Sequence, residues 1–405
     1  MSFFKSLPFK LLLGIIIGGC LGIWAWGARD GAASGYIMQV IVCAHRLMGQ
    51  FVSFCVPLIV LGFICPSITK MGQNAGRLLG VGLIIAYMSS VLAATMSAVA
   101  ANAIVPMLNI AQPEAERALP EAIFVLNIPQ VMSVITALVL SIVIGLAAVW
   151  TKSKLTIDLL AEFQQIVLDI VNKVVIPILP FYIGTTFTTL GYNGTLSQFP
   201  VFLAAIIVVI IGHFVWMAVL CGIAGAYSGK NPMDVIKYYG PAYITAVGTM
   251  SSAATLSVAL QCANKSPVLR KDLVGFGIPL FANIHLCGSV LTETFFIFIV
   301  SKIVFGAFPT APTMVLFIIL FGIFAVGAPG VPGGTVMASL GIVESIICAS
   351  FGASPEQIAT FTGMLLAIFA LQDSFGTACN VTGDGALTLF LTGYCEKHGI
   401  AEAKA

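Results

Sequence analysis

Two carboxylates near the end of the chain lie within an otherwise apolar segment. Asp373 and Asp384 are eleven residues apart, which on a helix is about three turns and places them close to one face. A carboxylate at the depth of a bilayer costs about 3 kcal/mol unless it is paired, so such a residue is a candidate for function. The sequence contains no Lys or Arg between Lys302 and Lys397. The expected partners are therefore a bound cation or the ammonium group of a ligand.

The residues just before Asp384 are rich in oxygen atoms that can bind a cation. The run from Asn380 to Asp384 reads Asn-Val-Thr-Gly-Asp and offers amide, hydroxyl, carbonyl and carboxylate oxygens. Hard cations such as sodium prefer ligands of this kind. We therefore expect Asn380 and Asp384 to contribute to a cation site.

The composition indicates that these residues lie in a membrane. Of the 405 residues, 59% are hydrophobic and only 8% are charged, whereas a soluble domain has about 25% charged residues. Apolar runs such as Phe199–Tyr227 exceed the roughly 20 residues that a helix needs to cross a bilayer. The net charge of +2 gives no reason to expect a nucleic-acid partner. The ten cysteines contain no Cys-x-x-Cys pair, so we expect neither a disulfide framework nor a metal site.

The positions of the basic residues predict the orientation. Positive charges cluster in alternate loops, and the positive-inside rule places those loops, and with them the N-terminus, in the cytoplasm. The clustered residues are Lys5, Lys10, Lys70, Arg77, Lys152, Lys154, Lys230 and Lys237. The first apolar run lacks a convincing cleavage site, so we interpret it as a retained span rather than a signal peptide.

The second half of the chain contains two apolar segments that are broken in the middle. Tyr238–Gln261 is broken by Gly248–Thr255, and Met314–Ser350 is broken by Gly327–Gly334. Each is followed by a long helix with a polar interruption, at residues 283–289 and at residues 373–384. Gly and Pro free backbone groups that lipid cannot satisfy, so a break is tolerated where it is buried or lines a cavity. The paired arrangement is typical of a repeat-built transporter around its binding site; the alternative is a set of ordinary Pro-kinked spans.

Three motifs together resemble one family. The run Asn380–Asp384 resembles the last-helix signature of the dicarboxylate/amino acid:cation symporters, also called glutamate transporter homologues. Thr249–Leu256 resembles the serine-rich tip of that family's first hairpin, and Gly327–Gly334 resembles its second tip, which contains Gly-Val-Pro-Gly. The resemblance covers nearly the whole chain in order and spacing. In its motifs the chain is most similar to the serine/threonine symporter branch.

The resemblance implies an all-α membrane protein with eight transmembrane helices, two re-entrant helical hairpins and inverted repeats. It implies a homotrimer in the plasma (bacterial inner) membrane and an elevator mechanism, in which a transport domain moves against a scaffold. The scaffold would comprise residues 1–77 (helices 1 and 2) and 107–192 (helices 4 and 5), and the transport domain residues 78–106 (helix 3) and 193–405. Within the last range helix 6 comes first. It is followed by hairpin 1 at about 234–262, helix 7 at about 273–305, hairpin 2 at about 314–350 and helix 8 at about 358–392.

The resemblance also implies roles for individual residues. Asp373 falls where the family binds the α-amino group of the substrate, and Asn380 and Ser252 fall where the α-carboxylate is held. Asp384 falls at a sodium ligand. The expected substrate-binding set is Ser251, Ser252, Gly330, Val331, Asp373, Gly376, Thr377 and Asn380.

Departures from the family pattern predict a neutral substrate. Where the dicarboxylate carriers have an arginine three residues after the aspartate, this chain has Gly376, and where the first tip often has another arginine it has Met250. With neither guanidinium, nothing in the pattern would pair with a side-chain carboxylate. We therefore expect small neutral amino acids, although the missing side chain at Gly376 also leaves room for a bulkier one.

The seventh helix departs from the pattern in its cation ligands. Where the family reads Asn-Met-Asp-Gly-Thr, this chain reads His-Leu-Cys-Gly-Ser from His285 to Ser289. Imidazole and thiol replace two hard oxygen ligands, so at least one family sodium site should be lost or altered. In the third span Tyr87, Ser89 and Ser90 resemble the remaining ligands with a shift of one residue.

Glu293 is a lone acid beyond that motif and is a candidate proton carrier. It aligns where sodium- and proton-coupled animal members keep a proton-carrying glutamate, and burial favours the protonated form of a carboxyl group. A structural glutamate is the alternative. The coupling ion is therefore expected to be sodium or a proton, with no other cofactor.

Other functions remain open. The chain could be a sodium-independent exchanger, an acidic amino acid transporter, or a channel whose acidic groups select cations. A more remote alternative is an intramembrane serine hydrolase that uses Ser251 or Ser252 with His285. Against it, the serines lack a Gly-x-Ser-x-Gly context and Asp384 would have no role.

Overall fold

The computed structural model describes residues 7–28, 32–73, 77–108, 110, 119–194, 199–328, 330 and 333–401. Nearly all of these residues are helical, and no strand occurs among them. Five helices are long and apolar enough to cross a membrane, or six if the bent pair at the end of the chain is counted as one span. The predicted all-α membrane class is confirmed. The expected number of eight spans is not established, because Leu12–Gly27 and Val139–Trp150 are apolar but shorter than a span.

One group of helices packs around a seam of glycines. Helix α1 (Leu7–Gly27) runs along α6 (Ile176–Tyr192), and both contact α2 (Ala32–Gln73). The backbones of α1 and α6 touch: a Cβ at Gly18 would lie 2.1 Å from the carbonyl oxygen of Gly184. Small residues permit this close approach in membrane helices. Two more helices, α4 (Val134–Trp150) and α5 (Lys154–Ile170), pack against α2.

Two prolines, Pro177 and Pro180, lie in the first part of α6. Between α5 and α6 the residues Val171–Val175 form a turn of π-helix. Proline lacks a backbone N–H, so Pro177 and Pro180 leave carbonyl groups one turn earlier without their usual helical donors. The wider turn accommodates that loss.

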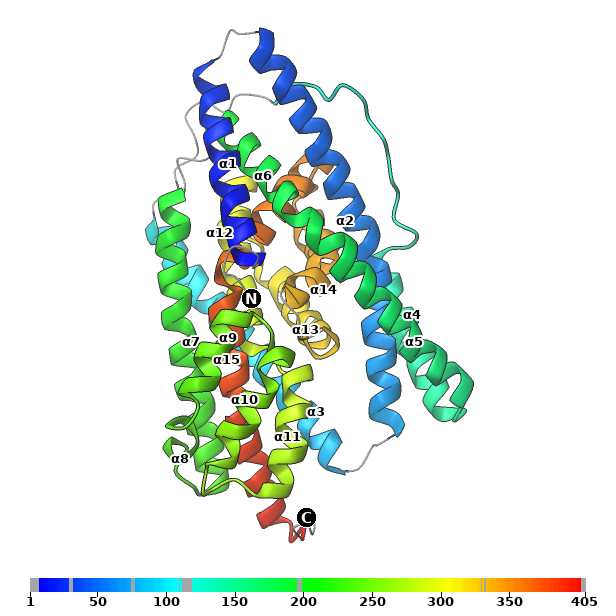
Figure 1. Ribbon diagram of the computed structural model, residues 1–405, viewed down its shortest axis with the longest axis vertical. Helices are drawn as coiled ribbons and strands as arrows, with labels where there is room; N and C mark the ends of the chain where they lie inside the picture. The colour runs from blue at the N-terminus through cyan, green and yellow to red at the C-terminus, as the bar shows by residue number, and fades with distance from the viewer. Residues whose placement is uncertain are drawn as a thin grey trace.

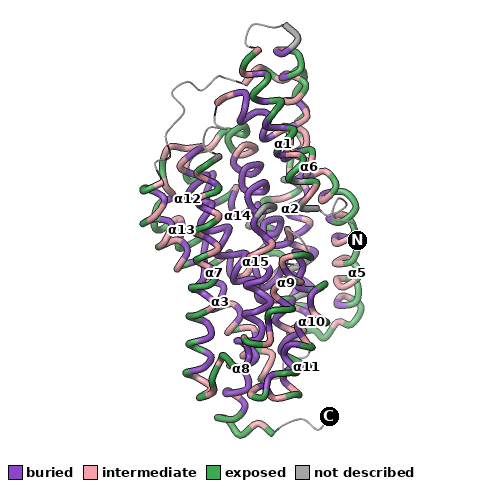
Figure 2. Tube along the Cα trace, turned by 60° about the vertical axis from the view of Figure 1, so that its left-hand side comes forward, coloured by how far each residue is buried: buried purple, intermediate pink, exposed green. Residues whose placement is uncertain are grey.

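A second group of helices surrounds the last helix. This helix, α15 (Pro355–Lys397), packs against α7 (Phe199–Ser228) and α12 (Cys287–Phe305), and α12 packs in turn against α3 (Arg77–Ile104). Figure 2 shows α12 and α15 mostly buried, whereas α3 and α7 have exposed outer faces. The candidate carboxylates therefore lie at the centre of this group.

Both predicted breaks occur in the structure. The first separates α9 (Gly240–Thr249) from α10 (Ser252–Asn264), which contact each other. At this break Met250 adopts a left-handed backbone conformation with φ of 52°, which is uncommon for a residue other than glycine. The second break separates α13 (Ala311–Gly327) from α14 (Gly334–Ile342), and a π-helical turn at Val343–Cys348 follows. A short helix, α8 (Met233–Ile236), precedes the first pair.

The two predicted interruptions of long helices have different outcomes. The first is confirmed, because α11 (Lys271–Ile284) ends just before His285 and α12 begins at Cys287. The second is wrong for the backbone: the residues from Asp373 to Asp384 are helical throughout. Instead α15 bends by 61° just before them, between Phe369 and Gln372. The polar residues are thus carried by a continuous helix.

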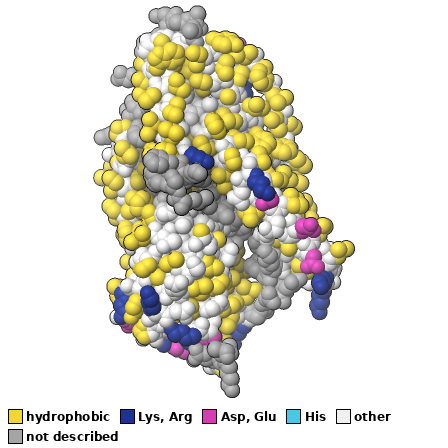
Figure 3. Space-filling model, viewed as in Figure 1, with side chains coloured by type: hydrophobic (Ala, Val, Ile, Leu, Met, Phe, Trp, Pro, Cys, Tyr) yellow, Lys and Arg dark blue, Asp and Glu magenta, His cyan; other side chains and the backbone are white. Residues whose placement is uncertain are grey.

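The surface agrees with a membrane environment. Figure 3 shows hydrophobic side chains over the upper part of the molecule, and charged side chains gathered at the lower end and along the outer end of α5. Ion pairs occur at α8, which lies at the lower end in Figure 1, and at the beginning of α11: these are Lys237–Asp234 and Arg270–Asp272. Lys5, Arg29 and Arg117, which bear on the predicted orientation, lie outside the described residues.

Candidate functional site

The two helix breaks meet each other in space. The hydroxyl of Ser251 at the first break donates a 2.7 Å hydrogen bond to the carbonyl of Gly330 at the second. The backbone N–H of Ala253 donates to the same carbonyl at 3.3 Å. Ser251 is also the N-cap of α10, where its side chain accepts from the N–H of Ala254. We call these two breaks tip 1 (Met250–Ser251) and tip 2 (residues 328–333). Val331, which we expected at the site, lies outside the described residues.

Asp373 lies directly behind tip 2. One carboxylate oxygen accepts a 3.0 Å hydrogen bond from the N–H of Gly333, and the other accepts from the hydroxyl of Ser289 at 3.3 Å. Its exposed fraction is only 3%. Both donors are uncharged, and among the described residues no Lys or Arg pairs with it. Sequence reasoning missed Gly333 and Ser289 as its partners, although their motifs were recognised.

Asn380 joins α15 to the beginning of α12. Its side-chain oxygen accepts hydrogen bonds from the N–H groups of Gly288 at 2.7 Å and Ser289 at 3.4 Å. Its amide nitrogen donates to the hydroxyl of Ser289 at 3.0 Å. The first N–H groups of a helix have no partner within the helix, and the N-cap residue Leu286 supplies none. Asn380 therefore caps α12 from a neighbouring helix.

His285 connects the third span to Asp384. Its Nδ1 lies 3.0 Å from Oδ1 of Asp384, and its Nε2 lies 2.8 Å from the hydroxyl of Ser89. The ring is fully buried, with an edge toward Phe281, and it lies close to the α-carbon of Gly383. An ionised carboxylate can only accept, so we assign a hydrogen to Nδ1 of the ring. The two residues are thus direct partners, an arrangement that their sequence separation does not reveal.

The other two residues of the third span, Tyr87 and Ser90, have different surroundings. Ser90 is buried, and its hydroxyl has no hydrogen-bond partner among the described residues. Tyr87 instead donates a 3.2 Å bond to the carbonyl of Ile319 in α13. Of the three residues expected near the cation ligands, only Ser89 therefore contacts that group in the structure.

Gly376 lies at the closest approach of α12 and α15. A Cβ on Gly288 would be 2.4 Å from the carbonyl oxygen of Gly376, and one on Gly376 would be 3.2 Å from the backbone nitrogen of Ser289. The space that we expected beside Gly376 is thus occupied by backbone. The expectation that its missing side chain leaves room for a bulkier substrate is wrong on this side.

Ser252, Thr377 and Glu293 are buried in the same region. Ser252 begins α10 directly behind tip 1. The hydroxyl of Ser339 in α14 donates a short hydrogen bond to Oε1 of Glu293, whereas Oε2 of Glu293 has no partner among the described residues. Glu293 thus links the helix that holds Ser289 to the helix that follows tip 2.

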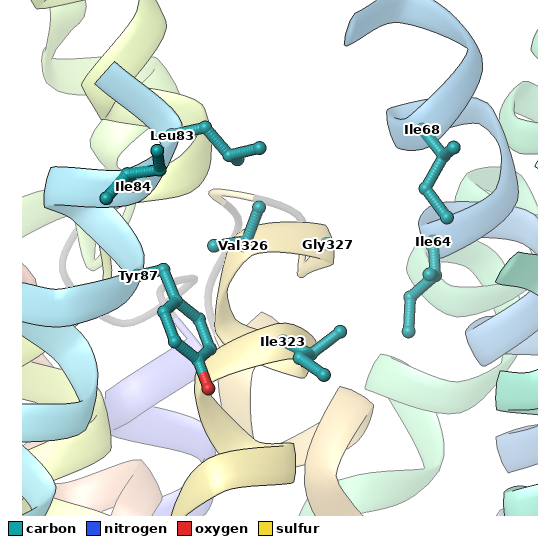
Figure 4. A pocket seen from close by; sticks show the side chains of 8 residues that line it. All are labelled: Ile64, Ile68, Leu83, Ile84, Tyr87, Ile323, Val326 and Gly327. Atoms are coloured by element: carbon teal, nitrogen blue, oxygen red, sulfur yellow. The ribbon is translucent and has the colours of Figure 1, made fainter. Parts of the chain in front are cut away.

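An apolar cavity of about 300 Å³ lies beside tip 2. Figure 4 shows Ile64 and Ile68 of α2 facing Ile323, Val326 and Gly327 of α13 across this cavity, with α3 forming the third side. None of these side chains offers a charge, so the cavity is a gap between helix groups and not a polar binding site.

The geometry does not support the hydrolase alternative. A serine nucleophile needs a base within hydrogen-bond reach. Ser251 instead donates to the carbonyl of Gly330, and both ring nitrogens of His285 are used by Ser89 and Asp384. The serines and the histidine therefore do not form a catalytic pair.

Comparison with known proteins identifies the family. The sequence profile of the sodium:dicarboxylate symporter family matches residues 7–393. The chain belongs to this family. The sodium:dicarboxylate symporter family consists of membrane transporters, so the chain is a symporter and not an enzyme.

Individual relatives within the sodium:dicarboxylate symporter family are distant. The chain is 26% identical over 411 residues to a serine/threonine transporter SstT of Streptococcus thermophilus, covering 95% of this chain and 94% of that protein. A serine/threonine transporter SstT of Streptococcus agalactiae serotype Ia is also 26% identical over the same shares of the two chains. Each of these matches therefore spans nearly the whole length of both proteins.

Proposed function

We propose that this chain is a secondary transporter that carries small neutral amino acids together with a cation, sodium or a proton. The observation that supports this best is Asp373, a buried carboxylate placed between tip 2 and the beginning of α12. Its partners are uncharged, so it retains the capacity to bind an ammonium group. A charged hydrogen bond in such a site contributes about 1.5–3 kcal/mol.

A neutral side chain on the substrate is supported by what surrounds Asp373. Gly376 and Met250 stand where the resemblance places arginines, and among the described residues no guanidinium pairs with the site. The serine/threonine names of the relatives point the same way. The α-carboxylate of such a substrate would bind backbone N–H groups at the start of a helix, which favour an anion. The substrate-binding set is Ser251, Ser252, Gly330, Asp373, Gly376, Thr377 and Asn380.

We also propose the elevator mechanism. The group of α1, α2, α4, α5 and α6 would be the scaffold, and α3 with α7 to α15 the moving part. Figure 1 shows the two groups offset along the long axis of the molecule. The apolar cavity beside tip 2 lies between the two groups, and so does an exposed ion pair, Arg46–Glu356 at 2.6 Å. A sliding motion would change the shape of the cavity and break this ion pair. We also propose that the chain forms a homotrimer and that its N-terminus lies in the cytoplasm.

The deciding experiment is a thermal unfolding screen of the purified protein with each amino acid. A ligand that binds the folded state raises the unfolding midpoint. We expect serine, threonine or alanine to raise it and aspartate and glutamate to raise it less. Stabilisation by the acidic amino acids alone would contradict the neutral preference. Stabilisation by none would contradict amino acid transport.

A further inference from the structure

The position beside Asp384, where the family resemblance implies a sodium ion, is taken up by a side chain of the protein itself. The ring of His285 lies between Oδ1 of Asp384 and the hydroxyl of Ser89, at 3.0 and 2.8 Å. Both oxygens belong to residues that resemble sodium ligands. The imidazole therefore occupies the place that an ion would need to contact both of them.

The remaining side-chain oxygen atoms near Asp384 do not form a coordination shell for a cation. The side-chain oxygen of Asn380 is already engaged by two N–H groups of α12. Position 287 carries a thiol, which is a poor ligand for a hard cation. Asp384 Oδ2 and the hydroxyl of Ser90 lack partners among the described residues. These side-chain oxygens alone are too few to replace the hydration shell of a hard cation, which takes about six oxygen ligands.

The ring is also held where it is. It lies with an edge toward Phe281, and a Cβ at Gly383 would be only 2.7 Å from its Cε1. The backbone at His285 is extended, because α11 has ended one residue earlier. A ring in this confined position has little freedom to swing away and admit an ion.

We infer that His285 determines the ion specificity of this transporter, because its imidazole fills the cation position beside Asp384 and excludes sodium from it. This inference rests on the proposed function, since ion specificity has meaning only for a coupled transporter. At this position the chain would depart from the sodium that its family's description names.

The first test measures sodium binding to the purified full-length protein. Thermal unfolding is recorded in sodium chloride and in choline chloride of equal ionic strength, and binding of radioactive sodium is measured in parallel. We expect Asp384→Asn to leave both sodium responses unchanged. A saturable sodium response of the wild-type protein that disappears in Asp384→Asn would overturn the inference.

The second test restores the oxygen ligands. The variant His285→Asn with Cys287→Asp should gain a sodium-specific rise of at least about 2 °C in the unfolding midpoint at saturating sodium. Asp384→Asn added to it should remove that rise. A folded double variant that binds no sodium would contradict the role of His285. If the double variant does not fold, His285→Asn alone is tested for the same sodium-specific rise. His213→Asn is the matched control, because it replaces another buried histidine and should gain no sodium response.

A third measurement separates this inference from the proposed function. Amino acids are added to the wild-type protein in choline chloride. Stabilisation by a neutral amino acid without sodium supports the inference. Stabilisation that requires sodium and is lost in Asp384→Asn contradicts it. If no amino acid stabilises the protein under any condition, the proposed function fails, while the sodium measurements on Asp384 still decide the inference.

Discussion

The hydroxyl of Ser251 donates a 2.7 Å hydrogen bond to the carbonyl of Gly330, and this contact holds tip 1 against tip 2. The two residues are seventy-nine positions apart in the sequence. Together with the bond from Gly333 to Asp373, the contact closes the tips over the buried carboxylate. A substrate must therefore disturb hydrogen bonds at tip 2 in order to reach Asp373.

Asp373→Asn should weaken amino acid binding by at least about tenfold, because a charged hydrogen bond contributes roughly 1.5–3 kcal/mol. The amide keeps the shape of the side chain and one acceptor for Ser289 or Gly333, so the protein should remain folded. The measurement is the affinity from thermal shift or from competition binding.

Ser374→Ala is the matched control on the same helix, since Ser374 is only half-buried and was not assigned to the site. It should bind substrate as the wild type does. An unchanged affinity in Asp373→Asn would remove Asp373 from the site.

Ser251→Ala should loosen the contact between the tips. The substitution removes the hydrogen bond to Gly330 and the N-cap of α10, and loss of such a cap costs about 1 kcal/mol. We expect substrate to dissociate several-fold faster, with a small decrease in the unfolding midpoint. Ser251→Thr retains a hydroxyl, so its rate of substrate dissociation and its unfolding midpoint should be close to those of the wild type. If both variants release substrate at the same rate, the hydroxyl has no part in closure.

A cross-link between α2 and α13 tests whether the two helix groups move past each other. A Cβ built on Gly327 lies 3.6 Å from Cβ of Ile64, within the range of about 3.5–4.5 Å found in disulfides. Ile64→Cys with Gly327→Cys should therefore form a disulfide on mild oxidation. We expect the oxidised protein to bind substrate but to lose transport, and a reductant to restore it.

The single variants Ile64→Cys and Gly327→Cys, oxidised in the same way, control for the ten native cysteines. Transport that continues at the normal rate in the fully cross-linked protein would show that α13 does not move against α2.

Glu293→Gln should abolish any acceleration of uptake by an inward proton gradient in proteoliposomes. The glutamate is fully buried, and one of its oxygens has no partner among the described residues, so it can accept a proton without breaking the bond from Ser339. Exchange of substrate should persist, because glutamine can still accept that bond. A variant with the full response to the gradient would exclude Glu293 as the proton carrier.

Composition and helix-breaking residues were sufficient to predict the all-α membrane class and the two helix breaks. The low charge content predicts the membrane class, and Gly, Pro and Ser mark the breaks at Met250–Ser251 and at residues 328–333. The bend in α15 could not be predicted in this way, because Phe369–Gln372 contains neither Gly nor Pro. Without a helix-breaking residue, the local pattern gives no sign of the bend.

The site was predictable as a set of residues but not as a set of contacts. Buried carboxylates in an apolar segment and an oxygen-rich run selected Asp373, Asn380 and Asp384, and the motif resemblance assigned their roles. The partners of His285 lie 196 and 99 residues away in the sequence, at Ser89 and Asp384. Sequence reasoning noted His285 as a poor sodium ligand and as the base of a remote hydrolase alternative, and in neither case as a partner of Ser89 or Asp384. Contacts between distant segments depend on how the helices cross, so the structure was needed to place the ring between these two oxygens.

The glycine contact between α12 and α15 has a consequence for redesign of the substrate preference. Because Gly288 and Gly376 touch through their backbones, the contact between α12 and α15 cannot be widened by trimming side chains at these two positions, since neither has one. Mutations intended to admit larger amino acids should therefore begin at Met250 and at the residues around Gly330. There the boundary of the site is made of two separate tips, which can be changed without separating α12 from α15.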